Sequence, residues 1–85
     1  MKQLNEKVAI VTGAGQGIGQ GIALCLGKRG VKVVCVGRRP EPIEATAKEI
    51  RDLGGESFAM TCDTADRDRV KEVVAKTVET YKTVD

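Results

Sequence analysis

Five glycines at alternate positions form the most distinctive chemical feature of this sequence: Gly13, Gly15, Gly17, Gly19 and Gly21. Fixing so many glycines in one conformation costs conformational entropy, so we expect a specific function to offset that cost. Without Cβ atoms, backbone N–H groups can approach a phosphate closely, and a turn leading into a helix adds the positive end of the helix dipole. The strict G-x-G-x-x-G and Walker A patterns are both absent from the run. The segment therefore predicts a phosphate-binding turn; the alternative is a closely packed turn that binds nothing.

Two arginines, Arg38 and Arg39, follow a second apolar run. About 20 residues beyond such a glycine turn, dinucleotide-binding folds that select NAD carry an Asp or Glu for the adenosine ribose. Here Gly37 stands at that position. A glycine leaves room for a 2′-phosphate, which a guanidinium can bind with two parallel hydrogen bonds. The sequence therefore predicts that NADP(H) is preferred over NAD(H); the alternative is a pair of solvated arginines in a loop before a helix.

The elements that would position these residues alternate along the chain. Runs of strand length at 7–12, 31–37 and 56–61 alternate with segments of helical spacing at 18–30, 43–55 and 68–82. The order β-α-β-α-β-α indicates an α/β fold with a parallel sheet covered by helices. Right-handed crossovers then give strand order 3-2-1, a Rossmann-type half of a doubly wound fold. The glycines and the arginines would lie at the carboxyl ends of strands, where such sheets bind ligands.

The apolar spacing also predicts which face of each helix is buried. The first helix places Ile18, Ile22, Cys25 and Leu26 near one side, the second Ile43, Ala47, Ile50 and Leu53, and the third Val70, Val73, Val74, Thr77, Val78 and Tyr81. Pro42 suits a first helical turn, Gly30 suits a helix end, and Asp66 suits an N-cap.

The segment TGAGQGIG, from Thr12 to Gly19, has the pattern T-G-x-x-x-G-x-G and directly follows the strand-like VAIVT. With GIGQGIALCLGKRGVKVVCVGRR and FAMTCDTADRDRVKEVV, it resembles the N-terminal, cofactor-binding portion of the classical short-chain dehydrogenase/reductase family. The resemblance covers essentially the whole chain. It implies that residues 1–85 form the N-terminal part of a single NAD(P)-binding Rossmann domain.

The same resemblance implies roles for individual residues. Gly13, Gly17 and Gly19 would be the turn and approach glycines, Gly15, Gln16 and Ile18 would line the pyrophosphate and the nicotinamide-side ribose, and Thr12 would hold the turn through its hydroxyl. Arg38 falls where NADP-binding members carry their arginine. Asp63 would accept a hydrogen bond from the adenine amino group, with Thr64 beside the ring. For Asp63 the alternative is a turn or capping residue.

The catalytic residues of that family are absent from these 85 residues. Hydride transfer to a carbonyl needs a proton donor, which the family supplies from Tyr-x-x-x-Lys with a serine and an asparagine. Tyr81 is the only tyrosine, Asp85 lies four residues later, and the apolar stripe indicates a packing role. We therefore expect this chain alone to be inactive. A first strand exposed at the sheet edge favours association, and a homo-oligomer is expected.

Composition excludes several other classes. The net charge of +2 gives no support for nucleic-acid binding, and no apolar run reaches the length of a membrane span. The N-terminus lacks a secretion signal, so a cytoplasmic location is expected. Three cysteines without a Cys-x-x-Cys pair are predicted to be small buried hydrophobes, the alternative being a redox or metal role. Histidine is absent, and no metal site is predicted.

The leading hypothesis is the NADP(H)-binding portion of a short-chain-type oxidoreductase. It would transfer hydride between NADP(H) and a ketone or secondary alcohol, with 3-oxoacyl thioesters among the candidates. One alternative is a non-catalytic dinucleotide-binding module or a truncated fragment without activity. Another is an interaction domain with no affinity for dinucleotides.

Overall fold

The structure is a computed structural model that describes residues 7–82 and 84. Strands and helices alternate as β1 (Val8–Thr12), α1 (Gly17–Lys28), β2 (Lys32–Gly37), α2 (Pro40–Asp52), β3 (Ser57–Thr61) and α3 (Arg67–Tyr81). The predicted order of elements is confirmed, and each strand begins one residue later than the apolar pattern suggested.

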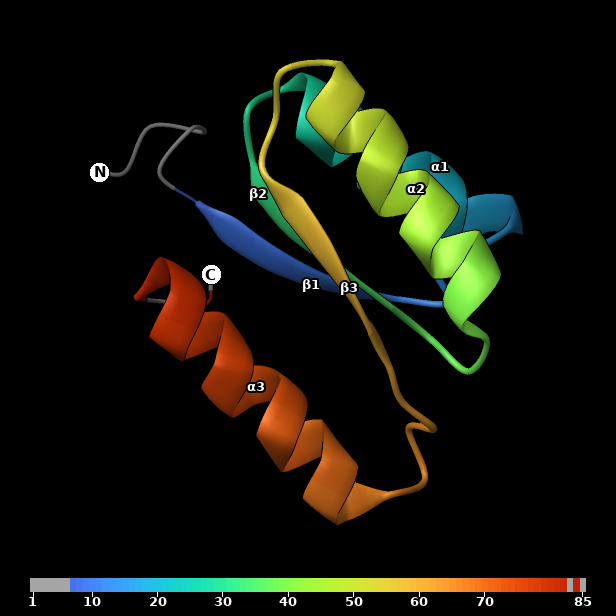
Figure 1. Cartoon of the computed structure of the whole chain (residues 1–85), viewed down its shortest axis with the longest axis vertical. Helices are drawn as coiled ribbons and strands as arrows, with labels where there is room; N and C mark the ends of the chain where they lie inside the picture. Colours follow the sequence, from blue (N-terminus) through green and yellow to red (C-terminus); the bar gives the residue numbers. More distant parts are fainter. Residues whose placement is uncertain (1–6, 83, 85) are drawn as a thin grey trace.

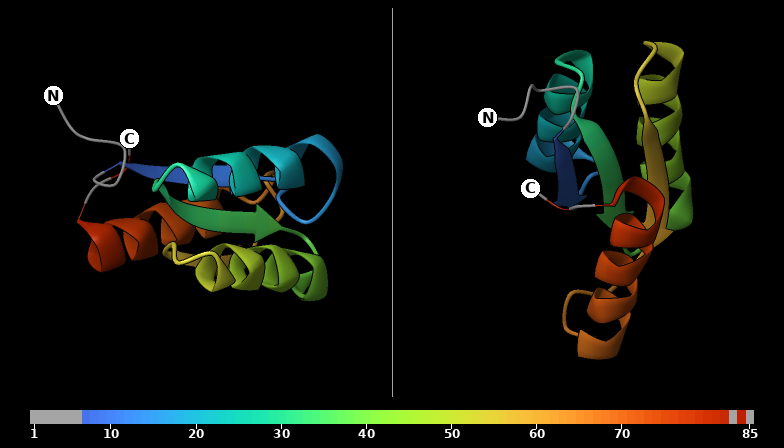
Figure 2. Two further views of the ribbon diagram at one scale, coloured as in Figure 1. Left: turned by 90° about the horizontal axis from the view of Figure 1, so that it is seen from above. Right: turned by 90° about the vertical axis from the view of Figure 1, so that its left-hand side faces the viewer.

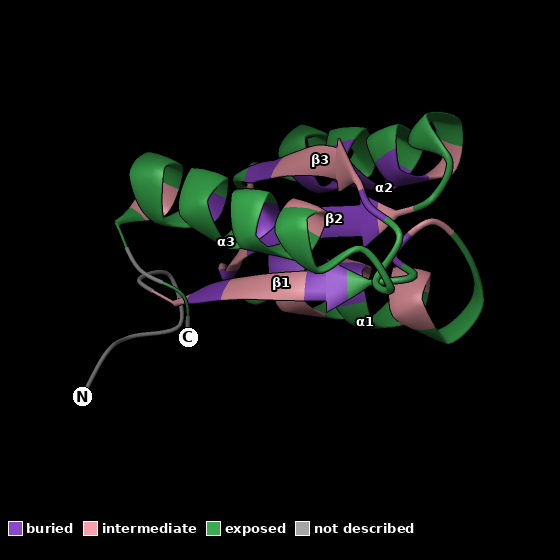
Figure 3. Cartoon of the chain, turned by 90° about the horizontal axis from the view of Figure 1, so that it is seen from below, coloured by how far each residue is buried: buried purple, intermediate pink, exposed green. Residues whose placement is uncertain are grey.

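The three strands form one parallel sheet with β2 in the centre, in the predicted order. In the register, Val11 pairs with Cys35 and Cys35 with Ala59. The β-branched run in β2 is buried on both faces, since Val33, Val34 and Val36 are at most 2% exposed. Figure 3 shows this buried centre flanked by helices whose outer surfaces are exposed. A continuous apolar run is what a strand covered on both faces requires.

Helices cover both faces of the sheet. Figures 1 and 2 show α1 and α2 together on one face and α3 on the other. The first face has the larger buried cluster, which includes Val33, Cys35, Ile43 and Ile50. The second cluster gathers Val34, Val36, Cys62 and Val73. Alternation of side chains along β2 therefore divides one strand between two cores.

The helix ends follow local residue preferences. Helix α2 begins at Pro40, and Pro42 lies in its first turn as predicted. Proline at the first position fixes the φ angle that a helical turn needs, and it holds the preceding Arg39 extended, at ψ 132°. The Asp66 side chain accepts a hydrogen bond of 3.1 Å from the Arg69 backbone N–H, so the predicted N-cap of α3 is confirmed. Gly30, with φ of +91°, follows the end of α1 as predicted.

The predicted buried face of α1 is wrong for three of its four residues, and only Leu26, which is half-buried, packs against the core. Ile18 and Ile22 are 84% and 48% exposed, and the buried residues of this helix are Ala23 and Gly27. A Cβ at Gly27 would lie only 2.8 Å from the Ile50 Cγ2 atom. Small residues face inward because α1 approaches α2 too closely for larger ones.

Three further expectations about burial also need correction. Cys25 is exposed, on the outer side of α1, although Cys35 and Cys62 are buried as predicted. Leu53 is 54% exposed, because α2 ends one residue before it. In α3 only Val73 and Thr77 of the predicted stripe are buried, whereas Val70, Val74 and Val78 are 37–43% exposed.

Candidate functional site

A cavity of about 630 Å³ lies at the carboxyl ends of β1 and β2. Its lining residues come from the glycine turn, the end of β2, the start of α2 and the loop after β3: Thr12, Gly13, Gly15, Gln16, Val36, Gly37, Arg38, Arg39, Pro42, Ile43, Cys62 and Thr64. This is the edge at which parallel α/β sheets bind ligands. The fold therefore brings the glycine segment and the arginine pair, far apart in sequence, to one cavity.

The glycine turn depends on glycine for two different reasons. Gly13 and Gly17 have φ angles of +64° and +59°, which side chains other than glycine rarely adopt. Gly15 and Gly19 are required by packing instead. A Cβ at Gly15 would lie 2.5 Å from the Pro42 Cβ, and one at Gly19 would clash with the Gly13 carbonyl. The bare backbone thus lets the turn fold tightly and leaves its outer side open to the cavity.

The start of α1 adjoins the same cavity. Gln16 is the N-cap residue, but its side chain makes no capping hydrogen bond, and the first turn contains no acidic residue. The first N–H groups of a helix have no partner within the helix, and they carry the positive end of its dipole. An anion at this point would find hydrogen-bond donors and a favourable field.

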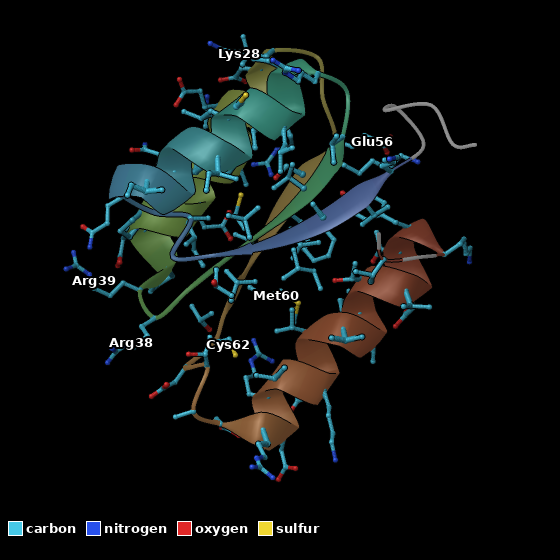
Figure 4. All side chains as sticks on the ribbon, turned by 180° about the vertical axis from the view of Figure 1, so that it is seen from behind. Lys28, Arg38, Arg39, Glu56, Met60 and Cys62 are labelled. Carbon is cyan, nitrogen blue, oxygen red and sulfur yellow. The ribbon has the colours of Figure 1, made fainter. Side chains whose placement is uncertain are left out.

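The opposite wall of the cavity is cationic. Arg38 and Arg39 are exposed, and Figure 4 shows both extending outward beside the glycine turn. Within the described part of the chain neither guanidinium forms an ion pair or a hydrogen bond, and no acidic side chain lines the cavity. Two unpaired guanidiniums without a competing carboxylate suit a phosphate group.

The loop after β3 forms the third wall. The Cys62 thiol lies 3.4 Å from the Asp63 carbonyl, and Cys62 lines both the main cavity and a smaller hollow beside it. That hollow, of about 330 Å³, is also lined by Arg38, Asp63 and Arg69. One carboxylate oxygen of Asp63, Oδ1, accepts a hydrogen bond of 3.0 Å from the Ala65 N–H. Asp63 therefore has the turn-forming role that was the alternative prediction for it. Its carboxylate is exposed and can accept further hydrogen bonds.

Seven of the predicted site residues line the cavity: Thr12, Gly13, Gly15, Gln16, Arg38, Arg39 and Thr64. Asp63 lines only the adjoining hollow. Gly17, Ile18 and Gly19 belong to the first turn of α1 and are not among the lining residues. The Thr12 side chain makes no hydrogen bond to the described residues. The Ala14 N–H, which donates 3.1 Å to the Val36 carbonyl, joins this turn to β2 instead.

Gly37, which the sequence placed where NAD-selecting folds carry an acid, also lines the cavity. The remaining four lining residues were not predicted: Val36, Pro42, Ile43 and Cys62. Two of them adjoin predicted residues, since Val36 precedes Gly37 at the end of β2 and Cys62 precedes Asp63. Their positions at strand ends, next to predicted residues, were the signal that could have identified them from the sequence. Pro42 and Ile43 had no such signal, because their place depends on α2 beginning at Pro40.

Outside the cavity, the described residues also bear on whether the chain has a reactive thiol, a metal site or a membrane span. Cys35 lies in the core rather than at the cavity, where burial raises the pKa of its thiol, against an opposing effect of the hydrogen bond with Ser57. Among the described residues no cluster of His, Cys, Asp and Glu could hold a metal ion. No helix among these residues has the length and apolar character of a membrane span.

Comparison with known proteins assigns this architecture to a family. The family model described as short chain dehydrogenase matches residues 7–85. The chain belongs to that family. It is 38% identical over its whole length to a 3β-hydroxysteroid dehydrogenase of Mediterraneibacter gnavus, and 41% identical to a protein of Streptomyces coelicolor named as a ketoacyl reductase. The chain spans about a third of these relatives, 31% and 33% of their lengths.

Solved structures of short-chain dehydrogenases have the same fold. The structure superposes with a TM-score of 0.91 on a metagenomic short-chain oxidoreductase in complex with NADP, at 34% identity over 99% of this chain and 38% of the other. With a hydroxysteroid dehydrogenase from Escherichia coli the TM-score is 0.90, at 31% identity over 99% of this chain and 37% of the other. The chain therefore has a Rossmann-type architecture and belongs to an oxidoreductase family that uses nicotinamide dinucleotides.

Proposed function

We propose that this chain forms the NADP(H)-binding portion of a short-chain oxidoreductase. The supporting observation is the composition of the cavity: a glycine turn on one side, Arg38 and Arg39 on the other, and no carboxylate among the lining residues. An acid at the end of β2 would repel a 2′-phosphate, whereas Gly37 leaves the position open. The solved relative in complex with NADP adds support from a protein of the same fold.

The residues present fit such a cofactor. Backbone N–H groups of the glycine turn and of the first turn of α1 would hold the diphosphate, because no side chain caps them. Arg38 would bind the 2′-phosphate, with Arg39 beside it. Asp63 and Thr64 would contact the adenine. When bound, the cofactor supplies or accepts the hydride, and the residues of this chain bind and orient it.

The reaction would interconvert a ketone and a secondary alcohol. The names of the steroid dehydrogenase and ketoacyl reductase relatives support this class, and a 3-oxoacyl thioester is the specific candidate that the second name favours. Residues 1–85 would be the N-terminal part of one domain, with the proton donor outside them. A coding sequence beyond Asp85 that contains Tyr-x-x-x-Lys would support this arrangement, and its absence would favour a non-catalytic dinucleotide-binding module.

Titration with both cofactors tests the proposal. The binding of NADPH and NADH is measured by calorimetry at fixed ionic strength. We expect NADPH to bind about ten- to several-hundredfold more tightly, as one or two charge-assisted hydrogen bonds would produce. Tighter binding of NADH would contradict the assignment of Arg38, and binding of neither would contradict the proposed function.

We also propose a cytoplasmic homo-oligomer. Exposed Val70, Val74 and Val78 form an apolar row along α3, and β1 is an edge strand of the described sheet. Apolar rows and sheet edges favour association. Sedimentation velocity tests the proposed association, because a single monomeric species at micromolar concentrations would contradict a homo-oligomer.

A further inference from the structure

The two walls of the cavity belong to separate segments, so some contact must set the distance between them. The glycine turn follows β1, and the wall with Arg38 and Arg39 joins β2 to α2. A dinucleotide that binds with its diphosphate on one wall and its 2′-phosphate on the other must span that distance. Its affinity therefore depends on how firmly the two walls are held together.

Ala14 is the point at which the glycine turn is attached to the other wall. Its side chain is completely buried, between two glycines that are not. Its N–H donates a hydrogen bond of 3.1 Å to the Val36 carbonyl at the end of β2. Its carbonyl accepts a hydrogen bond of 2.9 Å from the Thr46 hydroxyl of α2. Both backbone polar groups of Ala14, its N–H and its carbonyl, are thus held by the second wall and its helix.

The Thr46 hydroxyl is unusual for a helical threonine. A threonine inside a helix commonly bonds the carbonyl four residues earlier, as Thr77 does with Val73 at 2.8 Å. The Thr46 hydroxyl also donates to such a carbonyl, that of Pro42 at 3.1 Å, but its shorter hydrogen bond, of 2.9 Å, is to the carbonyl of Ala14, 32 residues away in the sequence. Thr46 is completely buried and is not a lining residue of the cavity.

From these contacts we infer that Thr46 is a positioning residue, which fixes the glycine turn relative to the arginine wall without touching the cofactor. The close packing of Gly15 against Pro42 acts at the same junction. Loss of the hydroxyl leaves the Ala14 carbonyl without its donor from α2 and lets the walls separate. This inference rests on the proposed function, because it concerns a ligand that binds both walls.

The test compares a ligand that spans both walls with one that reaches a single wall. NADPH and adenosine 2′-monophosphate are titrated against the chain as it occurs, together with any polypeptide that continues it. Thr46→Val keeps the shape of the side chain and removes the hydroxyl. We expect it to weaken NADPH about three- to tenfold, the effect of one ordinary hydrogen bond, and adenosine 2′-monophosphate less than about twofold.

Three control variants separate positioning from stability. Thr46→Ser keeps the hydroxyl and should retain wild-type affinity for NADPH. Thr77→Val removes an equally buried hydroxyl from α3 that does not line the cavity, and should lower stability without changing the ratio of the two affinities. If Thr46→Val does not fold, Thr46→Ala compared with Thr46→Ser gives the same test, since these two differ by one oxygen atom.

The outcomes are distinguishable. If wild-type protein binds NADPH but Thr46→Val weakens both ligands equally, or neither, the positioning role is wrong and the proposed function stands. The same holds if Thr77→Val changes the ratio as much as Thr46→Val. If wild-type protein does not bind NADPH, the proposed function fails and the positioning role fails with it.

Discussion

The Cys62 backbone N–H donates a hydrogen bond of 2.8 Å to the carbonyl of Gly37. This bond joins the loop after β3 to the end of β2, so two of the three cavity walls are linked at Gly37. The same residue occupies the position of the acid that selects NAD in related folds. We therefore expect a substitution at Gly37 to change the preference between NADP(H) and NAD(H).

Replacing Gly37 with aspartate should shift the preference from NADPH to NADH. The new carboxylate would repel a 2′-phosphate and could accept hydrogen bonds from ribose hydroxyls instead. We expect NADPH to bind at least about tenfold more weakly and NADH to be affected far less. Calorimetric titration of both cofactors measures the change.

The matched control is Gly37→Ala. A Cβ at this position would lie 2.7 Å from the Ile43 Cγ2 atom, a methyl group on the Cβ of a buried β-branched side chain, so Ile43 would have to move. Both variants carry that steric cost, and only the aspartate adds charge. Equal losses of NADPH affinity in the two variants would show that packing, rather than charge, controls the site.

Arg38 should contribute to NADPH binding and little to NADH binding. Its guanidinium lines the cavity without an ion-pair partner in the described residues, so it is available for a phosphate. We expect Arg38→Ala to weaken NADPH about ten- to several-hundredfold and to leave NADH within about twofold. Arg39→Ala is the comparison and should weaken NADPH less. Equal losses for both cofactors in Arg38→Ala would indicate a general structural role.

Two glycines of α1 should respond oppositely to alanine. At Gly19 a Cβ would meet the Gly13 backbone carbonyl, so Gly19→Ala should cost about 1–3 kcal/mol and weaken NADPH binding. At Gly21 a Cβ would meet nothing within 4 Å, so Gly21→Ala should stabilise the chain by about 0.5–1 kcal/mol through helix propensity. Urea unfolding measures both free energies. Similar losses in the two variants would contradict this account of the turn.

The sequence was sufficient for the order of elements and the position of the cavity. The apolar, β-branched run of β2 indicated a buried strand, and the residues after it were then expected at the ligand-binding edge. The inward face of α1 was not predictable, because the exposed Ile18 and Ile22 are larger and more apolar than the buried Ala23 and Gly27. The spacing of apolar residues says nothing about how closely two helices approach. The hydrogen bond from Thr46 to Ala14 could not be predicted for a similar reason, because it joins residues far apart in the sequence.

The three cysteines should differ in their reaction with a maleimide. Cys25 is exposed and should react first, Cys62 is 6% exposed at the cavity and should react slowly, and Cys35 is completely buried and should react last. Burial also raises the pKa of the Cys35 thiol, which lowers its thiolate fraction. NADPH should protect Cys62 alone. Peptide mass mapping over time measures each rate, and slowing of Cys25 by NADPH would contradict the placement of the site.

Ionisation of Tyr81 should destabilise the fold at alkaline pH. Its ring lies 5.5 Å from that of Phe58, centre to centre, and the Lys32 ammonium is 5.7 Å from its centre. Burial raises the pKa of Tyr81, Glu56 and Cys35 act in the same direction, and Arg51 opposes them. A raised pKa in the folded state means that this contribution to stability is complete below the unfolded value of about 10 and is lost as pH rises through the folded value.

Tyr81→Phe keeps the ring and removes the ionisable group, so it isolates this effect. We expect urea unfolding of the wild type to show a fall in stability between about pH 9 and pH 12 that exceeds the fall in the variant. Cys35 ionises at alkaline pH in both proteins, so its contribution largely cancels in the comparison. If the variant loses as much stability as the wild type over this pH range, the ionisation of Tyr81 is not coupled to folding.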